Sequence, residues 1–246
     1  MDKEYYIFGT RAIIEAINNG RNIEKILVKK GLSNDLFQQL QPLIKDNNIP
    51  VQQVPVEKIN RITRKNHQGV LAFISPIEYS NIEVLLPGLF ETGKDPLILV
   101  LDQITDVRNF GAIARTAECG SVDAIIIPEK GMARIGADAV KTSAGALHYV
   151  PVCKVKNLVK SVRFLSDSGL KIFAATEKGN KIYTDTNFQT PAAIVMGSEE
   201  DGISSAILDL AHEKIKIPIH GNIESLNVSV SAALMIYEAL RQRNYS

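Results

Sequence analysis

The spacing of apolar residues alternates between short unbroken runs and longer helical patterns along most of this chain. Leu97–Leu101 is an unbroken apolar run between Pro96 and Asp102, which is typical of a buried strand. From residue 109 to 119 the apolar spacing lengthens and alanine becomes frequent, which favours a helix. This alternation predicts a mainly parallel sheet with helices on both faces. We expect strands near 97–101, 122–127, 148–152, 171–175, 192–196 and 214–219, and helices near 110–119, 136–145, 157–167, 203–210 and 228–242.

The first 78 residues carry a separate pattern of the same kind. Apolar residues between Ile7 and Asn18 recur at helical spacing and predict an amphipathic helix. Residues 79–95 contain Pro87-Gly88 and Gly93, which are typical of a linker. The sequence therefore predicts an α/β fold in two domains, a small one over 1–78 and a larger one over 96–246, joined by a linker over 79–95. In the small domain we expect a second helix at 33–45 and strands at 25–28, 51–54 and 70–75.

The composition is that of a globular protein with little excess charge. Of 246 residues, 45% are apolar and 22% are charged, and the net charge is +1. Residues 1–79 carry 11 Lys and Arg against 8 Asp and Glu, whereas residues 80–246 carry 17 against 19. Any affinity for phosphate is therefore expected in patches, and more in the small domain than in the large one.

The sequence indicates neither a membrane-spanning helix nor a metal site. No apolar run approaches the roughly 20 residues that a membrane-spanning helix needs, and the first residues have no signal-peptide character. Two cysteines, Cys119 and Cys153, fit neither a metal-binding spacing nor a disulfide framework. We therefore expect a cytoplasmic protein that has no membrane partner and no metal site.

The first candidate site follows the strand at 97–101. Asn109 and Gly111 are expected at the start of a helix, with Arg115 one turn inside it. Free N–H groups at a helix start and an arginine fork both suit a phosphate group, and RNA is the first candidate ligand. The alternative is an ordinary cap and turn beside a solvated arginine. The segment has no G-x-G-x-x-G, which disfavours a dinucleotide site.

Two further polar segments follow predicted strands of the same sheet. Gly197 permits a close backbone approach, and Glu199 has the chemistry to hold a ribose hydroxyl or to orient Arg115. Ser225 and Asn227 precede an alanine-rich helix. The alternatives are an acidic helix start for the first segment and simple N-caps for the second. Because ligands bind outside the carboxyl ends of parallel strands, the three segments together predict one pocket.

These residues resemble the three motifs of the SpoU (TrmH-type) 2′-O-ribose RNA methyltransferases. The motifs occur in the family's order and span most of residues 97–240. Two further segments, 64–70 and 142–147, resemble the RlmB branch of the family, which methylates a guanosine of large-subunit (23S) ribosomal RNA. The matching patterns are Asn109-x-Gly111-x-x-x-Arg115, Val195-Met196-Gly197-x-Glu199-x-x-Gly202 and Ile217-Pro218-x-x-Gly221-x-x-x-Ser225-Leu226-Asn227-Val228-Ser229.

The resemblance implies a SPOUT methyltransferase domain with a C-terminal trefoil knot, preceded by a small domain similar to ribosomal-protein-like RNA-binding domains. It also implies a homodimer with a composite active site, ribosomal RNA as the substrate and S-adenosylmethionine as the cofactor. The residues that would bind the cofactor are Ala175, Thr176, Gly197, Ile217, Leu226 and Asn227.

The resemblance assigns catalysis to Arg115, which would come from the subunit opposite the cofactor, grip the target phosphate and help to activate the 2′-hydroxyl. The pKa of a free arginine exceeds about 12, so stabilisation of the developing alkoxide describes its role better than proton removal. Asn109, Glu199, Ser225 and Asn227 would position Arg115 and the ribose. The expected RNA-binding residues are Arg11, Arg64, Lys65, His67, Gln68 and Arg108; for His67 the alternative is a turn residue.

Three rival interpretations remain at this point. The first is a tRNA ribose as the target, although the small N-terminal domain favours ribosomal RNA. The second is an RNA-binding module without catalysis, which the presence of Arg115, Glu199 and Asn227 disfavours. The third is a nicotinamide-dependent oxidoreductase, disfavoured by the missing glycine pattern.

Overall fold

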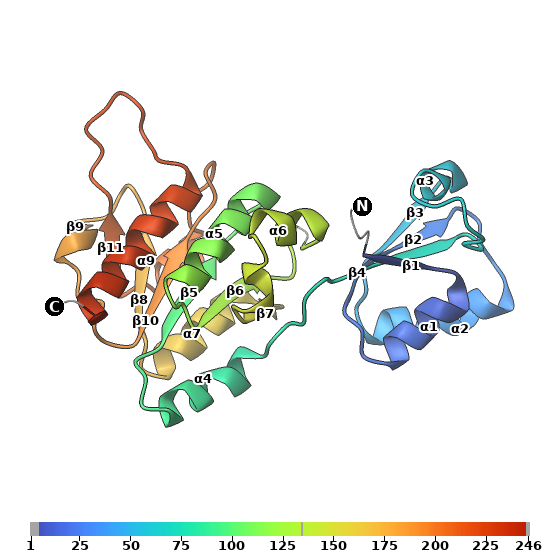
Figure 1. Ribbon diagram of the computed structural model, residues 1–246, viewed down its shortest axis with the longest axis horizontal. Coiled ribbons are helices and arrows are strands. Elements are labelled where there is room, and N and C mark those ends of the chain that lie inside the picture. Colours follow the sequence, from blue (N-terminus) through green and yellow to red (C-terminus); the bar gives the residue numbers. More distant parts are fainter. Residues whose placement is uncertain (1–4, 134, 245–246) are drawn as a thin grey trace. The chain divides into compact units, whose positions relative to one another are not determined.

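The computed structural model describes residues 5–133 and 135–244, and contacts within the chain group them into two compact units. The boundary falls between Glu78 and Tyr79. Each unit has its own sheet and its own buried core (Figure 1). Within the described ranges, no helix is both long and apolar enough to cross a membrane.

The small unit is a four-stranded sheet with two helices on one face and one on the other. Its elements are β1 Tyr6–Phe8, α1 Thr10–Asn18, β2 Ile23–Lys29, α2 Asp35–Asp46, β3 Val51–Val54, α3 Val56–Asn60 and β4 Val70–Ile74. The strand order is β1-β4-β2-β3, and β4 runs antiparallel to both of its neighbours. Alternation along β2 places Ile26 and Val28 in the core under α1 and α2, and Leu27 in the core under α3.

The start of the small unit differs from the predicted helix at 7–18. Tyr6, Ile7 and Phe8 pair with β4 as a strand, and the helix begins only at Thr10. Gly9 makes the change of direction at a φ of 87°. The apolar residues of this strand and of α1 lie next to each other in sequence, so their combined spacing resembled one longer helix.

The large unit confirms the predicted parallel sheet. Seven strands lie in the order β7-β6-β5-β10-β8-β11-β9, and every pair is parallel. The elements are α4 Ile82–Glu91, β5 Leu97–Leu101, α5 Val107–Cys119, β6 Ala124–Pro128, α6 Ala137–Thr142, β7 Val152–Val155, α7 Leu158–Asp167, β8 Lys171–Ala175, β9 Lys181–Ile182, β10 Ala192–Met196, α8 Ser205–Leu208, β11 Glu213–Lys216 and α9 Val228–Asn244.

Helices cover both faces of this sheet. Ile98 and Val100 of β5 belong to the core that packs under α4, α7 and α8. The other face carries α5 and α9, which pack against each other (Figure 1). Cys153 is fully buried in the core, and burial raises the pKa of its thiol to about 11, whereas Cys119 is exposed.

Residues 79–95 differ from the expected linker. Tyr79 forms a parallel bridge with Val152, and residues 82–91 form α4. Ile82 and Leu86 are buried in the core of the large unit. The apolar residues of this segment do have helical spacing, but Pro87-Gly88 masks the pattern because these residues usually interrupt helices.

The carboxyl end of α9 is fixed to the amino-terminal edge of the sheet. The Gln242 side chain accepts from the Phe188 N–H and donates to the Thr186 carbonyl, both at 2.8 Å. Arg243 donates to the carbonyls of Phe188 and Thr190, also at 2.8 Å each. Burial lowers the pKa of this guanidinium. These bonds fix the carboxyl end of α9, and the other end of this helix reaches the candidate site.

Gly111 is required by the packing of α5 rather than by a free helix start. A Cβ atom at this position would lie 2.7 Å from the Cβ of Thr142 and 3.1 Å from the Ala139 carbonyl oxygen. Both neighbours belong to α6, so the glycine lets two helices approach closely.

We expect Gly111→Ala to lower the free energy of unfolding by about 1–3 kcal/mol, because the added methyl group overpacks the contact with α6. Gly88→Ala in α4 is the matched control. Its Cβ would meet nothing within 4 Å, so alanine is expected to raise stability by up to about 1 kcal/mol. Urea unfolding of both variants measures the difference. Equal stability of the two variants would contradict this account of Gly111.

Candidate functional site

Four neighbouring strands end at one edge of the large sheet and deliver the predicted site segments there. The strands are β5, β10, β8 and β11, in that spatial order. The chain leaves them into residues 102–106, 197–204, 176–180 and 217–227. Because all four strands are parallel, their carboxyl ends share one edge, which is where open α/β sheets bind ligands.

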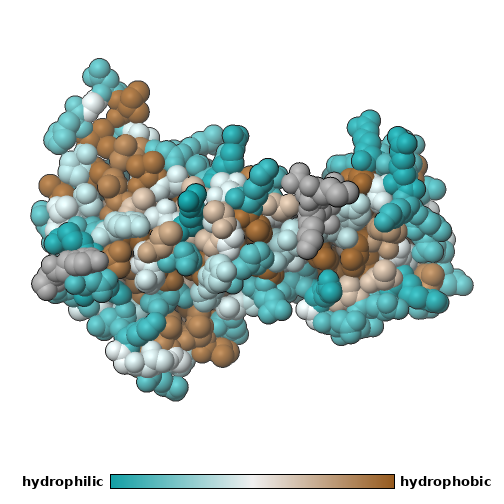
Figure 2. Space-filling view, viewed as in Figure 1, coloured by the Kyte–Doolittle hydropathy of each residue, from teal (hydrophilic) through white to brown (hydrophobic). Residues whose placement is uncertain are grey.

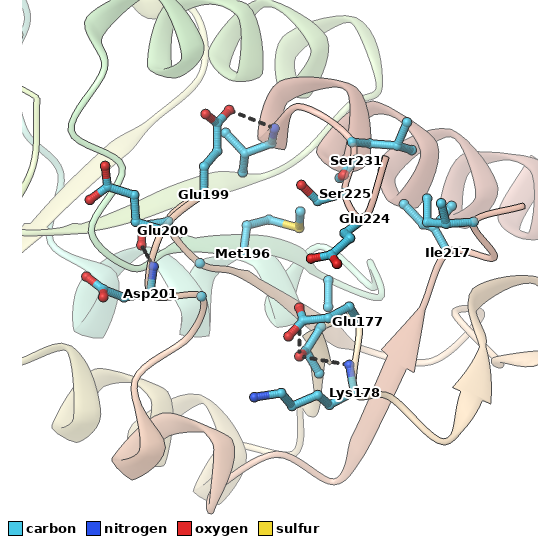
Figure 3. A pocket seen from close by; sticks show the side chains of 18 of the residues that line it. Glu177, Lys178, Met196, Glu199, Glu200, Asp201, Ile217, Glu224, Ser225 and Ser231 are labelled. Atoms are coloured by element: carbon cyan, nitrogen blue, oxygen red, sulfur yellow. Dashed lines mark hydrogen bonds between the residues drawn. The ribbon is translucent and has the colours of Figure 1, made fainter. Parts of the chain in front are cut away.

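A cavity of about 360 Å³ opens at this edge, a size within the usual range for small-molecule sites. Figure 3 shows side chains from three strand ends and from α9 surrounding it. The predicted cofactor residues that line it are Ala175, Thr176, Gly197, Ile217 and Leu226, and Glu199 and Ser225 line it too.

Gly197 owes its place to a tight hairpin that presents Glu199. Ser198 and Gly202 exchange two backbone hydrogen bonds of 3.1 Å, and the Asp201 N–H donates to Oγ of Ser198 at 2.9 Å. A Cβ on Gly197 would lie 2.1 Å from the Gly202 carbonyl carbon. Only glycine leaves room for the chain to fold back here.

Glu199 joins the three predicted segments through a single oxygen. Its Oε1 accepts from Nδ2 of Asn109 at 3.0 Å and from Nδ2 of Asn227 at 2.8 Å. The Val228 N–H donates to the same oxygen at 3.3 Å. The Asn227 amide also donates to Oδ1 of Asn109 at 3.0 Å. Three residues separated by up to 118 positions therefore form one network, strengthened by the charge of the carboxylate.

Asn227 is also the N-cap of α9. Its Oδ1 accepts from the N–H of Ser229 at 2.9 Å and from Oγ of Ser229 at 2.6 Å. The side chain thus uses its oxygen for the helix and its amide nitrogen for the network with Asn109 and Glu199. The N-cap alternative for Asn227 is therefore confirmed, and the same side chain also bonds Asn109 and Glu199.

The start of α5 differs from the prediction. The helix begins at Val107, two residues before Asn109, and Asp106 caps it. Oδ1 of Asp106 accepts from the N–H groups of Arg108 at 2.6 Å and Asn109 at 3.3 Å. These N–H groups are therefore not free for phosphate, and Asn109 acts through its side chain instead.

Arg115 lies apart from the cavity of its own chain. It is exposed on α5, and it has no hydrogen bond or ion pair to any residue in the described ranges. It does not line the cavity. Arg108 is exposed seven residues earlier, which places it on the same side of the helix. The structure brings neither arginine into the network around Glu199.

Most of the predicted RNA-binding residues of the small unit gather at one end of its sheet. Arg11, Arg64, Lys65 and Gln68 are all exposed. Backbone hydrogen bonds link the segments that carry them, because the Gly9 N–H donates to the Val70 carbonyl at 3.1 Å and the Lys29 N–H donates to the Gly69 carbonyl at 2.8 Å. Lys29 and Lys30 add two exposed cations there.

His67 departs from this group, because it is only 9% exposed and both of its ring nitrogens are engaged. The Gly69 N–H donates to Nδ1 at 3.0 Å, so the ring proton is on Nε2, which donates to Oδ1 of Asn60 at 2.8 Å. The predicted RNA contact is therefore wrong for His67, which instead shapes the turn that carries Gln68.

Several residues that line the cavity are not among the predicted site residues. Glu177 and Lys178 directly follow the predicted strand end, so their position was a usable signal. Glu224 lies beside the predicted Ser225. Ser231 and Met235 line the cavity from one and two turns inside α9, and only helix packing reveals them. Among the described residues, no three His, Cys, Asp or Glu side chains are grouped as metal ligands would be.

Two family models match the chain. The model described as "SpoU rRNA Methylase family" matches residues 96–237. The model described as "RNA 2'-O ribose methyltransferase substrate binding" matches residues 6–80. Together they cover both units.

Relatives and solved structures extend this similarity over the whole chain. The chain is 35% identical over 243 residues to a TrmH family tRNA/rRNA methyltransferase of Staphylococcus saprophyticus, covering 99% of this chain and 98% of the relative. A relative with the same description from Staphylococcus epidermidis is 37% identical, with 98% and 97% covered. The fold is similar to that of the SpoU methyltransferase AviRb from Streptomyces viridochromogenes, solved with AdoMet, at a TM-score of 0.62 and 22% identity, with 98% and 91% covered.

We expect the substitutions Asn109→Ala and Asn227→Ala to be non-additive in their effect on stability, because both side chains bond Glu199 and each other. The coupling free energy is expected to be about 0.5–1.5 kcal/mol. Urea unfolding of the two single variants and the double variant measures it. The control pair is Asn109→Ala with Asn81→Ala. The Asn81 side chain caps α4 and shares no partner with Asn109, so the effects of these two substitutions on stability are expected to add. Additive effects in the first pair would contradict the network.

Proposed function

The chain belongs to the SpoU family of RNA methyltransferases, and we propose that it methylates the ribose 2′-hydroxyl of a guanosine in large-subunit (23S) ribosomal RNA. It is a methyltransferase that uses S-adenosylmethionine. The observation that carries the proposal is the cavity at the strand ends, together with the Asn109–Glu199–Asn227 network beside it. This network joins residues of all three family motifs.

The residues around the cavity fit the cofactor. Part of the lining consists of strand ends with small or apolar residues, among them Ala175, Gly197 and Leu226. Such a wall suits an adenine ring and a methionine chain, and it leaves backbone groups available for hydrogen bonds. When bound, S-adenosylmethionine supplies the electrophilic methyl group. Glu199 and Ser225 lie at the same cavity and would position the ribose that receives it.

Arg115 supplies the positive charge of the proposed mechanism. A guanidinium is a permanent cation with no lone pair to accept a proton, so Arg115 does not remove the hydroxyl proton. Its role is to bind the phosphate next to the target ribose and to stabilise negative charge that develops on the 2′-oxygen. An exposed arginine whose side chain bonds none of the described residues is available for both tasks.

We further propose a homodimer in which Arg115 of one subunit serves the cofactor cavity of the other. Apolar residues are exposed on α9 and on the loop before it, as Figure 2 shows for this region. Ile223 is 75% exposed, and Val230 and Tyr237 of α9 are 48% and 50% exposed. Val230 and Tyr237 are seven residues apart and share one side of the helix. A second copy would cover this surface.

The basic end of the small unit is the proposed RNA-binding surface. Arg11, Arg64, Lys65 and Gln68 lie on linked segments there, and Lys29 and Lys30 increase the positive charge. The match of residues 6–80 to the substrate-binding model supports this assignment, as does the resemblance of residues 64–70 to the RlmB branch. We expect the enzyme to act in the cytoplasm and its methyltransferase domain to contain the family's trefoil knot.

We expect the purified protein to transfer tritiated methyl groups from S-adenosylmethionine to unmodified 23S ribosomal RNA, at a guanosine 2′-oxygen that then resists alkaline cleavage. Arg115→Ala is expected to lower the rate by at least about 100-fold, since it removes the charge that stabilises the transition state. Arg163→Ala, an exposed arginine of α7, is the control and keeps full activity. Label on tRNA alone would overturn the choice of substrate, and RNA binding without label on either RNA would overturn catalysis.

The composite site is tested by mixing two inactive variants. Arg115→Ala lacks the arginine, and Leu226→Trp fills the cavity with an indole ring. If the arginine crosses between subunits, a one-to-one mixture is expected to regain about a quarter of the normal activity, because half of the dimers are mixed and each has one intact site. No recovery in a mixture that does exchange subunits would place Arg115 and the cofactor in the same chain.

We expect the double charge reversal Arg64→Glu with Lys65→Glu to weaken RNA binding by about tenfold or more and to reduce its salt dependence by about one to two phosphate contacts. S-adenosylmethionine binding should remain unchanged. Filter binding over a salt series measures the effect, and the matched double reversal outside the small unit is Lys160→Glu with Arg163→Glu, both exposed on α7. An equal loss in the control would show general repulsion rather than a binding surface.

A further inference from the structure

We propose that Glu224, with Glu177, makes the cofactor cavity selective for a positively charged ligand, so that it prefers S-adenosylmethionine to the neutral-sulfur product S-adenosylhomocysteine. The inference rests on the proposed function, because it concerns the same cavity. It assigns a role to two residues that the family motifs do not include.

The cavity is strongly acidic. Of the described residues that line it, five are acidic, namely Glu177, Glu199, Glu200, Asp201 and Glu224, and Lys178 is the only basic one. Two of these carboxylates come from different segments of the wall, since Glu177 follows β8 and Glu224 lies on the loop between β11 and α9. Figure 3 shows both side chains extending into the cavity.

The carboxylate of Glu224 is free to meet a ligand. Glu199 is engaged with Asn109 and Asn227, and Oε2 of Glu177 is within 3.4 Å of the Thr176 hydroxyl. Glu224 has no hydrogen bond or ion pair to any residue within the described ranges. Its charge is therefore not neutralised by the protein, and a cation in the cavity would face it directly.

The reaction removes the charge that these carboxylates recognise. As the methyl group passes to the ribose oxygen, the C–S bond breaks and its electron pair stays on sulfur, while the hydroxyl proton leaves to solvent. The sulfonium thus becomes a neutral thioether, and the ligand loses one positive charge. A negative wall stabilises the substrate form more than the product form, which favours release of the product.

The test is isothermal titration calorimetry of the unaltered protein and of Glu224→Gln with three ligands. These are S-adenosylmethionine, S-adenosylhomocysteine and sinefungin, which carries a protonated amine in place of the sulfonium. In the variant we expect the preference for S-adenosylmethionine over S-adenosylhomocysteine to fall by about three- to tenfold, because one partly solvated charge is lost. The affinity for sinefungin is expected to fall in parallel with the affinity for S-adenosylmethionine. Added salt is expected to reduce the preference of the unaltered protein for S-adenosylmethionine over S-adenosylhomocysteine.

The control is Glu83→Gln, an exposed carboxylate of α4, which is expected to leave all three affinities unchanged. Equal weakening of all three ligands in Glu224→Gln would overturn the inference, since it would indicate a loss of shape or hydrogen bonding rather than charge. An unchanged preference would overturn it as well. If the unaltered protein binds none of the ligands, the proposed function itself fails and the inference fails with it.

Discussion

The site depends on one carboxylate oxygen. Oε1 of Glu199 accepts hydrogen bonds from the side chains of Asn109 and Asn227 and from the Val228 backbone, so α5, the hairpin after β10 and the start of α9 converge on it. A charged acceptor makes each of these bonds stronger than a neutral one would. Without this oxygen, two amide groups and a helix start would lose a shared partner at the edge of the cavity.

Several motif residues have a structural role in the fold in addition to their proposed role in the site. Gly111 allows α5 to approach α6, Gly197 allows the hairpin to close, and Asn227 caps α9. Each is therefore explained by packing or by backbone geometry alone. The cavity is nonetheless built from these same segments, because the close approaches that they permit place Glu199 beside Asn109 and Asn227. The fold and the proposed site therefore depend on the same residues.

Charge divides the molecule into regions with different tasks. The cavity wall is acidic, whereas the segments at one end of the small sheet present Arg11, Arg64 and Lys65. A nearly neutral total charge conceals this separation. An acidic wall suits a cationic cofactor and a basic surface suits an RNA backbone, so we propose that opposite electrostatic fields recognise the two ligands. Arg115 is a further proposed contact for RNA; it lies on the large unit, where its side chain has no hydrogen bond or ion pair to any described residue.

The sequence by itself determined the parallel sheet and the segments that meet at its edge. The spacing of apolar residues and the length of a strand are local properties, and the carboxyl ends of parallel strands lie at the same edge of a sheet. The sequence did not determine that Tyr6–Phe8 is a strand, that residues 82–91 are a core helix or that α5 begins at Val107. Those depend on pairing and burial against distant residues. The burial of His67 and the reach of Ser231 and Met235 into the cavity were likewise decided only by tertiary packing, which local patterns do not encode.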